Sequence, residues 1–191
     1  MYKRCTTEAT TQRQRILEQC FLDLLKVDSY DHITVGDICA SANVPRGMFY
    51  RYFDSKLDAL YALIDHTLLE FVTNVILLRK PEPDDSFGMR AVLDYWKSQK
   101  PLLEVLTKNG KEALLFERSI ICCTEDAHLL APYLTKAGHS TEPEVMVFCI
   151  NGILSAIMLW YRSGYAKSTE EMAVILHKLL TGPIVAPADP G

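Results

Sequence analysis

The stretch TVGDICASANVPRGMFYRYFDSK, residues Thr34–Lys56, predicts two short helices joined by a tight turn. Thr34 is a good N-cap, and Asp37 three residues later completes the pattern of a capping box. Asn43 tolerates the left-handed backbone that such a turn needs. Pro45 can open the second helix because a first turn does not use its missing N–H, although it offers no capping side chain. The predicted helices are 35–41 and 45–53.

The second of these helices has one apolar side and one side suited to nucleic acid. Phe49 and Phe53, four residues apart, share the apolar side. The other positions carry long hydrogen-bond donors and amphipathic aromatics, which suit phosphates and base edges. Lys56 follows in the first turn of the next helix, where the dipole disfavours a cation and a bound phosphate would explain its presence. Each residue alone is compatible with solvated surface or packing, but together they favour DNA.

The segment TVGDICASA followed by NVPRGMFYRYFDSK resembles the DNA-binding part of TetR/AcrR-type transcriptional regulators. The resemblance covers the first third of the chain, and it implies that the second helix enters the major groove. It implies base-edge contacts for Arg46 and Met48, backbone contacts for Tyr50 and Tyr52, and phosphate contacts for Thr34 and Lys56. Asn43 stands where the family often has Gly, and Pro45 where it often has Ser. The full set of predicted DNA-binding residues is Thr34, Pro45, Arg46, Met48, Tyr50, Arg51, Tyr52 and Lys56.

The composition is that of an ordinary globular protein with an uneven charge distribution. The chain has 191 residues, 49% hydrophobic residues and a net charge of −4. Residues 1–56 carry eight basic and seven acidic side chains, so the acidity lies in 57–191. Six cysteines without a CxxC pair, and a polar N-terminus without an apolar signal segment, predict a reduced cytoplasmic location.

The remaining chain predicts helices only, so the expected fold is all-α. Three N-terminal helices would form a helix-turn-helix domain, joined by a long helix to a larger helical ligand-binding and dimerisation domain. The arm at 1–11 is predicted to be disordered, and KPEPDD at 80–85 is a helix-breaking boundary. The predicted domains are 1–56 (helix-turn-helix at 34–53), 57–182 and a tail at 183–191. The other predicted helices are 11–26, 57–76, 86–99, 101–109, 111–123, 145–163 and 169–180. The segment 124–140 is ambiguous and leaves a short helix at 127–137 open.

The last two helices predict a homodimer. The segment VMVFCINGILSAIMLWYRS is apolar nearly all round, but it is short for a membrane span and Asn151, Gly152 and Ser155 interrupt it. We therefore expect no membrane partner and a helix buried on several sides; the alternative is a monomer with a large apolar core. The segments YWKSQKPLLEVLTKNG and WYRSGYAKSTEEMAVIL also resemble the TetR branch that contains the dihydroxyacetone-kinase-operon activator. That resemblance leaves the sign of regulation open.

The C-terminal domain also predicts a pocket for an unknown small-molecule effector, since aromatics with a few polar groups suit an apolar ligand. For each residue, packing in the core is the competing interpretation. Adjacent Cys122 and Cys123 lack zinc spacing, and no catalytic motif is present, so we expect no metal, no cofactor and no enzyme. The candidate pocket residues are Met89, Tyr95, Trp96, Phe116, His128, Phe148 and Trp160.

The sequence therefore predicts a sequence-specific transcriptional regulator, a ligand-responsive repressor that binds a palindromic double-stranded DNA operator as a dimer. The alternative is a helical ligand-binding or scaffold protein whose N-terminal helices bind protein rather than DNA. Salt-sensitive, sequence-specific DNA binding separates the two classes.

Overall fold

The chain is all-α, as the sequence predicted. The computed structural model describes residues 2, 3, 5, 7–73, 86–125, 127 and 142–181, and within these ranges every regular element is a helix. The chain forms two compact units, one comprising Met1–Glu70 with Lys100–Cys122 and the other Phe71–Gln99 with Cys123–Gly191. The functional boundary expected at residue 56 stays a prediction, because the first compact unit also includes residues 57–70 and 100–122.

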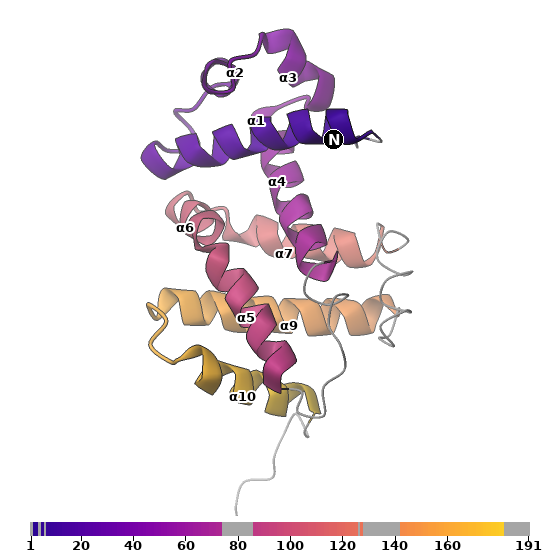
Figure 1. The fold of residues 1–191 in the computed structure, drawn as a ribbon, viewed down its shortest axis with the longest axis vertical. Helices are drawn as coiled ribbons and strands as arrows, with labels where there is room; N and C mark the ends of the chain where they lie inside the picture. The colour runs from indigo at the N-terminus through magenta and orange to yellow at the C-terminus, as the bar shows by residue number, and fades with distance from the viewer. Residues whose placement is uncertain are drawn as a thin grey trace, which may run out of the picture. The chain divides into compact units, whose positions relative to one another are not determined.

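Helix α1, Glu8–Val27, supports the N-terminal unit. The hydroxyl of Thr7 accepts a hydrogen bond from the Thr10 amide, which starts the helix three residues earlier than predicted. Its buried residues recur at helical spacing, with Leu17, Phe21 and Leu25 fully enclosed. Helix α2 contacts both α1 and α3, and α1 also contacts α6 (Figure 1).

The helix-turn-helix has the geometry expected from its caps. Helix α2, Val35–Ser41, begins with a complete capping box: the Asp37 amide donates to the Thr34 hydroxyl at 3.2 Å, and the Thr34 amide donates to the Asp37 carboxylate at 2.8 Å. Asn43 has a φ of 52°, which confirms the left-handed turn. Helix α3, Arg46–Tyr52, follows Pro45, whose side chain makes no capping bond.

Three further helices complete this unit. They are α4, Lys56–Phe71, α6, Lys100–Lys108, and α7, Glu112–Cys123. A buried, bidentate ion pair joins α7 to α4. Arg118 Nε donates to Asp65 Oδ1 at 2.7 Å, and Arg118 Nη2 donates to Asp65 Oδ2. The pair is fully enclosed and bidentate, so breaking it would leave an uncompensated buried charge.

The segment before α1 is ordered where it is described, so the predicted disorder at 1–11 is wrong there. Tyr2 is buried, the Lys3 amide donates to the Tyr52 carbonyl at 2.9 Å, and the Cys5 thiol donates to the Gln14 side chain at 2.9 Å. No local sequence pattern signals these contacts, because the partners lie nine or more residues away along the chain.

The second unit contains α5, Ser86–Ser98, α9, Pro143–Arg162, and α10, Thr169–Thr181. Helix α5 packs on both α9 and α10, and Arg90 pairs with Glu170 at 2.7 Å. The reciprocal bonds between Ser168 and Glu171 cap α10 as predicted. The predicted end of the long helix at 76, the boundary at 80–85, most of the helix at 127–137 and the tail at 183–191 lie outside the described residues.

Helix α9 is less buried than the sequence predicted. By length and composition it could cross a membrane, with a mean hydropathy of 1.7, yet only 28% of its most apolar window is buried within the chain. One such helix is weak evidence for a membrane span, since the core helix of a soluble protein can have the same length and composition.

Candidate nucleic-acid interface

Helix α3 separates its residues into a buried and an exposed side. Phe49 and the adjoining Phe53 are fully enclosed and lie with ring centroids 5.1 Å apart, which anchors a helix too short to persist alone. Arg46, Tyr50 and Arg51 are exposed. This division gives α3 a rigid apolar base and a solvent-facing row of hydrogen-bond donors, as a DNA-reading helix requires.

The Arg46 guanidinium lies across the first turn of α2. A Cβ atom at Gly36 would lie 2.6 Å from Arg46 Nη2, so glycine is what allows this close approach. The hydrogen bonds from Thr34, and then the nearby Arg46 charge, hold the pKa of the Asp37 carboxyl below its usual value. The Arg46 guanidinium thus lies beside the capping box. The sequence alone did not point to Gly36, because its role depends on an arginine ten residues away.

The two tyrosines predicted to contact the DNA backbone lie in different environments. Tyr50 is 51% exposed and stacks edge-on against Phe49, with its hydroxyl free to reach a phosphate. Tyr52 is 3% exposed, and its hydroxyl has no hydrogen-bond partner among the described residues. In this conformation Tyr52 supports the helix from within, so the predicted backbone contact would require its side chain to move.

The remaining predicted residues on this surface are accessible. Thr34 and Pro45 are exposed and Met48 is half-buried. The Thr34 hydroxyl donates to the Asp37 carboxylate at 2.7 Å, so a phosphate at this helix end would compete with an existing bond. The first turn of α2 and the exposed side of α3 therefore form one surface, and its contacts with DNA stay a prediction.

Lys56 has a structural role that sequence reasoning missed. Its ammonium donates to the carbonyls of Tyr30 at 2.6 Å and Ile33 at 2.9 Å, and lies 4.4 Å from the centre of the Tyr30 ring. Lys111 lies 4.6 Å from the same ring, and Asn109 accepts the Tyr30 amide proton at 2.7 Å. Lys56 thus fixes the loop that leads into α2, and a phosphate contact would add to this role or compete with it.

The candidate pocket residues are divided between the two units. Phe116 belongs to the first, while Met89, Tyr95, Trp96, Phe148 and Trp160 belong to the second, and His128 lies outside the described residues. Trp96 is fully buried against Phe71 and Tyr95, and its indole N–H has no acceptor among the described residues. Phe148 is 62% exposed, which suits contact with another chain better than a cavity wall. The pocket stays a prediction.

The cysteines and acidic groups show no metal-binding cluster within the part of the chain that the structure describes. Burial raises the pKa of the Cys123 thiol to about 11, so the reactive thiolate is scarce at neutral pH.

Comparison with known proteins agrees with this geometry. Residues 22–63, from the second half of α1 to within α4, match the family described as bacterial regulatory proteins, tetR family. This matched segment contains the whole helix-turn-helix, so the N-terminal residues are similar to the tetR family. The TetR fold extends further: a TetR-family transcriptional regulator from Streptomyces coelicolor superposes with a TM-score of 0.60 and 21% identity, over 88% of this chain and 97% of that chain.

Two other matches extend the comparison. The dihydroxyacetone kinase operon activator DhaS superposes with a TM-score of 0.56 and 17% identity, over 88% of this chain and 93% of its own, in agreement with the branch resemblance. The nucleoid occlusion factor SlmA of Citrobacter koseri is 29% identical over 116 residues. That match covers 59% of this chain and 57% of the relative, so the chain spans little more than half the length of this curated relative.

Proposed function

We propose that this chain is a dimeric, ligand-responsive regulator that reads a palindromic DNA operator with helix α3. The observation that carries the proposal is that Phe49 of α3 and the adjoining Phe53 are enclosed, while Arg46, Tyr50 and Arg51 of α3 are exposed. Such a helix can enter the major groove without disturbing its own support. The proposal assigns no catalytic role and places the protein with the DNA in the cytoplasm.

The proposed dimer uses an exposed stripe on α9. Its exposed residues alternate at spacings of three and four, which is the repeat of a helix–helix seam. Phe148 is 62% and Leu159 71% exposed, and an added Cβ at Gly152 would meet nothing within 4 Å. Small residues between large apolar ones allow two helices to approach closely. The stripe consists of Val145, Phe148, Gly152, Ser155 and Leu159.

Helix α10 extends this apolar surface. Val174 is 47%, Ile175 39% and Leu179 50% exposed in the single chain. Soluble monomers seldom expose so many large apolar side chains on consecutive helices. A two-fold pairing of α9 and α10 with their copies would cover them and present two α3 helices to the two halves of a palindrome.

The decisive experiment is selection of bound sequences from random duplex DNA with the purified full chain at near-physiological salt. Recovery of a palindrome supports both DNA reading and two-fold symmetry. Recovery of no preferred sequence, from protein shown to be folded and dimeric, contradicts operator reading by the ligand-free protein. Repeating the selection in the presence of metabolites from a cell extract then tests whether a ligand is required. If this selection also recovers no preferred sequence, the result favours an N-terminal unit that binds protein.

The dimer is tested independently by sedimentation. Phe148→Glu and Leu159→Glu place charges in the stripe and should shift the chain towards monomer. Ala91→Glu, on an exposed position of α5, is the matched control and should leave the mass unchanged. An unchanged mass for the two stripe variants would contradict this interface.

A second candidate function is nucleoid occlusion, the role named for the Citrobacter koseri relative. The similarity over 59% of this chain favours its consideration. Both functions require DNA reading, but only a transcriptional regulator must change the transcript levels of genes beside its sites. Mapping bound sites together with transcript levels, with and without the protein, separates the two.

A further inference from the structure

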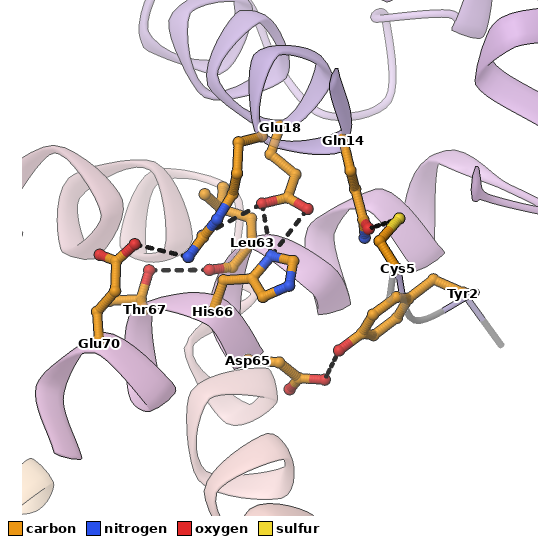
Figure 2. Close-up of polar contacts among 10 residues, drawn as sticks. Tyr2, Cys5, Gln14, Glu18, Leu63, Asp65, His66, Thr67 and Glu70 are labelled. Atoms are coloured by element: carbon orange, nitrogen blue, oxygen red, sulfur yellow. Dashed lines mark hydrogen bonds and ion pairs between the residues drawn. The ribbon is translucent and has the colours of Figure 1, made fainter. Parts of the chain in front are cut away.

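Tyr2, Lys3 and Cys5, which precede α1, dock onto the N-terminal unit at three points, two of which Figure 2 shows. The Tyr2 hydroxyl donates to Asp65 of α4 at 2.7 Å, and the Cys5 thiol donates to Gln14 of α1 at 2.9 Å. The third point is the Lys3 amide, which donates to the carbonyl of Tyr52 at 2.9 Å. Tyr2, Lys3 and Cys5 thus contact α4, α3 and α1, respectively.

The Lys3 contact closes the end of the recognition helix. Tyr52 is the last residue of α3, and the last carbonyls of a helix have no partner within it. Helix α3 has seven residues and depends on its surroundings for order. An external amide at its last carbonyl therefore stabilises the turn that carries Tyr50 and Arg51.

The hydrogen bond from the Tyr2 hydroxyl to Asp65 positions the neighbouring Lys3 amide. The Tyr2 side chain is 9% exposed, and its ring packs edge-on against His66 with a centroid distance of 6.1 Å. Its acceptor, Asp65, is the residue that pairs with Arg118 of α7. A chain of direct contacts thus runs from α7 through Asp65, Tyr2 and Lys3 to the end of α3.

We propose that Tyr2, Lys3 and Cys5 form a latch and that Tyr2 is a positioning residue for DNA reading. Tyr2 anchored on the Asp65–Arg118 pair holds the Lys3 amide against α3, so a displacement of α7 that alters this pair also alters the order of the recognition helix. The inference deepens the proposed DNA-binding function and depends on it for its role, although the latch itself is a property of the free protein.

Amide hydrogen exchange of the free full-length chain tests the latch without DNA. Tyr2→Phe removes only the hydroxyl, and Tyr2→Ala also removes the ring. We expect exchange of the α3 amides to accelerate about two- to tenfold, the effect of one lost hydrogen bond, and more for Tyr2→Ala. The α10 amides of the other unit should be unchanged. Gln12→Ala, on the exposed side of α1, is the control and should leave α3 unchanged.

Two exchange results would overturn the latch. One is unchanged α3 exchange in both Tyr2 variants. The other is an equal acceleration in α3 and α10, which would make Tyr2 a general stabilising residue. On DNA, Tyr2→Ala should weaken binding to the selected palindrome several-fold more than binding to random duplex. If the Tyr2 variants show faster α3 exchange but the protein binds no DNA, the latch is supported and the proposed DNA-binding function is rejected. Failure of the latch and failure of the proposed function are therefore distinguishable.

Discussion

A single methyl group added at Gly36 tests how Arg46 is positioned. In Gly36→Ala the new Cβ would lie 2.6 Å from Arg46 Nη2 and 3.3 Å from the Thr34 hydroxyl oxygen. Ordinary contact begins near 3.4 Å, so the guanidinium must shift by roughly 0.8 Å. Because the end of an arginine is flexible, this shift costs the free protein little. Alanine gains up to about 1 kcal/mol over glycine in a helix, so the unfolding free energy should stay level or rise.

DNA binding should change in the opposite direction. A good arginine–base contact is worth about 1–3 kcal/mol, which corresponds to roughly 5- to 150-fold in affinity. Displacing Arg46 should remove part of this, and we expect at least about a fivefold loss on the selected operator, measured by fluorescence anisotropy. The control for stability is Gly47→Ala, the equivalent second residue of α3, where an added Cβ meets nothing within 4 Å.

The refuting result comes from the same substitution in an Arg46→Ala background. If Gly36→Ala acts through Arg46, its effect on affinity should disappear there, since the two changes share one interaction. An equal loss in both backgrounds would refute the reasoning and show that the added methyl group meets the DNA directly.

Three other substitutions test separate parts of the first unit. Lys56→Met should lower the unfolding free energy by about 1–3 kcal/mol in chemical denaturation, because the loop carbonyls lose a charged donor. If the unfolding free energy is unchanged and the salt dependence of DNA binding falls by about one unit of slope, Lys56 is a phosphate contact alone. Arg118→Met should destabilise by about 3–5 kcal/mol, and adding Asp65→Leu should recover much of this; no recovery would show that the pair is not the cause. Because the Asp37 pKa is lowered in the folded state, the stabilisation by this carboxylate is present above the unfolded carboxyl pKa and is lost on acidification below about pH 4. Asp37→Asn should therefore flatten the pH dependence of the unfolding free energy in that range. The same pH dependence in both proteins would contradict this prediction.

The sequence determined those features that depend on neighbours three or four residues apart. The bounds of α2, the capping box of Thr34 and Asp37, the left-handed Asn43 and the cap of α10 were all predicted and are confirmed. Each is a local hydrogen bond or a local backbone preference, which the order of residues alone specifies. The two-helix reading unit, and with it the family resemblance, follows from these local rules.

The tertiary structure decided which side chains remain available for DNA. Both tyrosines of α3 have the same chemistry, yet packing against the core encloses Tyr52 and leaves Tyr50 exposed. Lys56 was expected at a phosphate, but the loop 30–33 folds back and surrounds its ammonium with carbonyls. No spacing rule predicts these outcomes, because the neighbours lie more than twenty residues away in the sequence.

The same reason explains the docking of the N-terminal segment and the grouping of the helices. Tyr2 reaches Asp65 across 63 residues of chain, and Asp65 reaches Arg118 across a further 53. These contacts draw α7 into the N-terminal unit, although its sequence reads as part of a later domain. Amphipathic periodicity identifies a helix and its apolar face, but only the folded chain selects the surface that covers that face, since burial is a property of the whole packing and not of one segment.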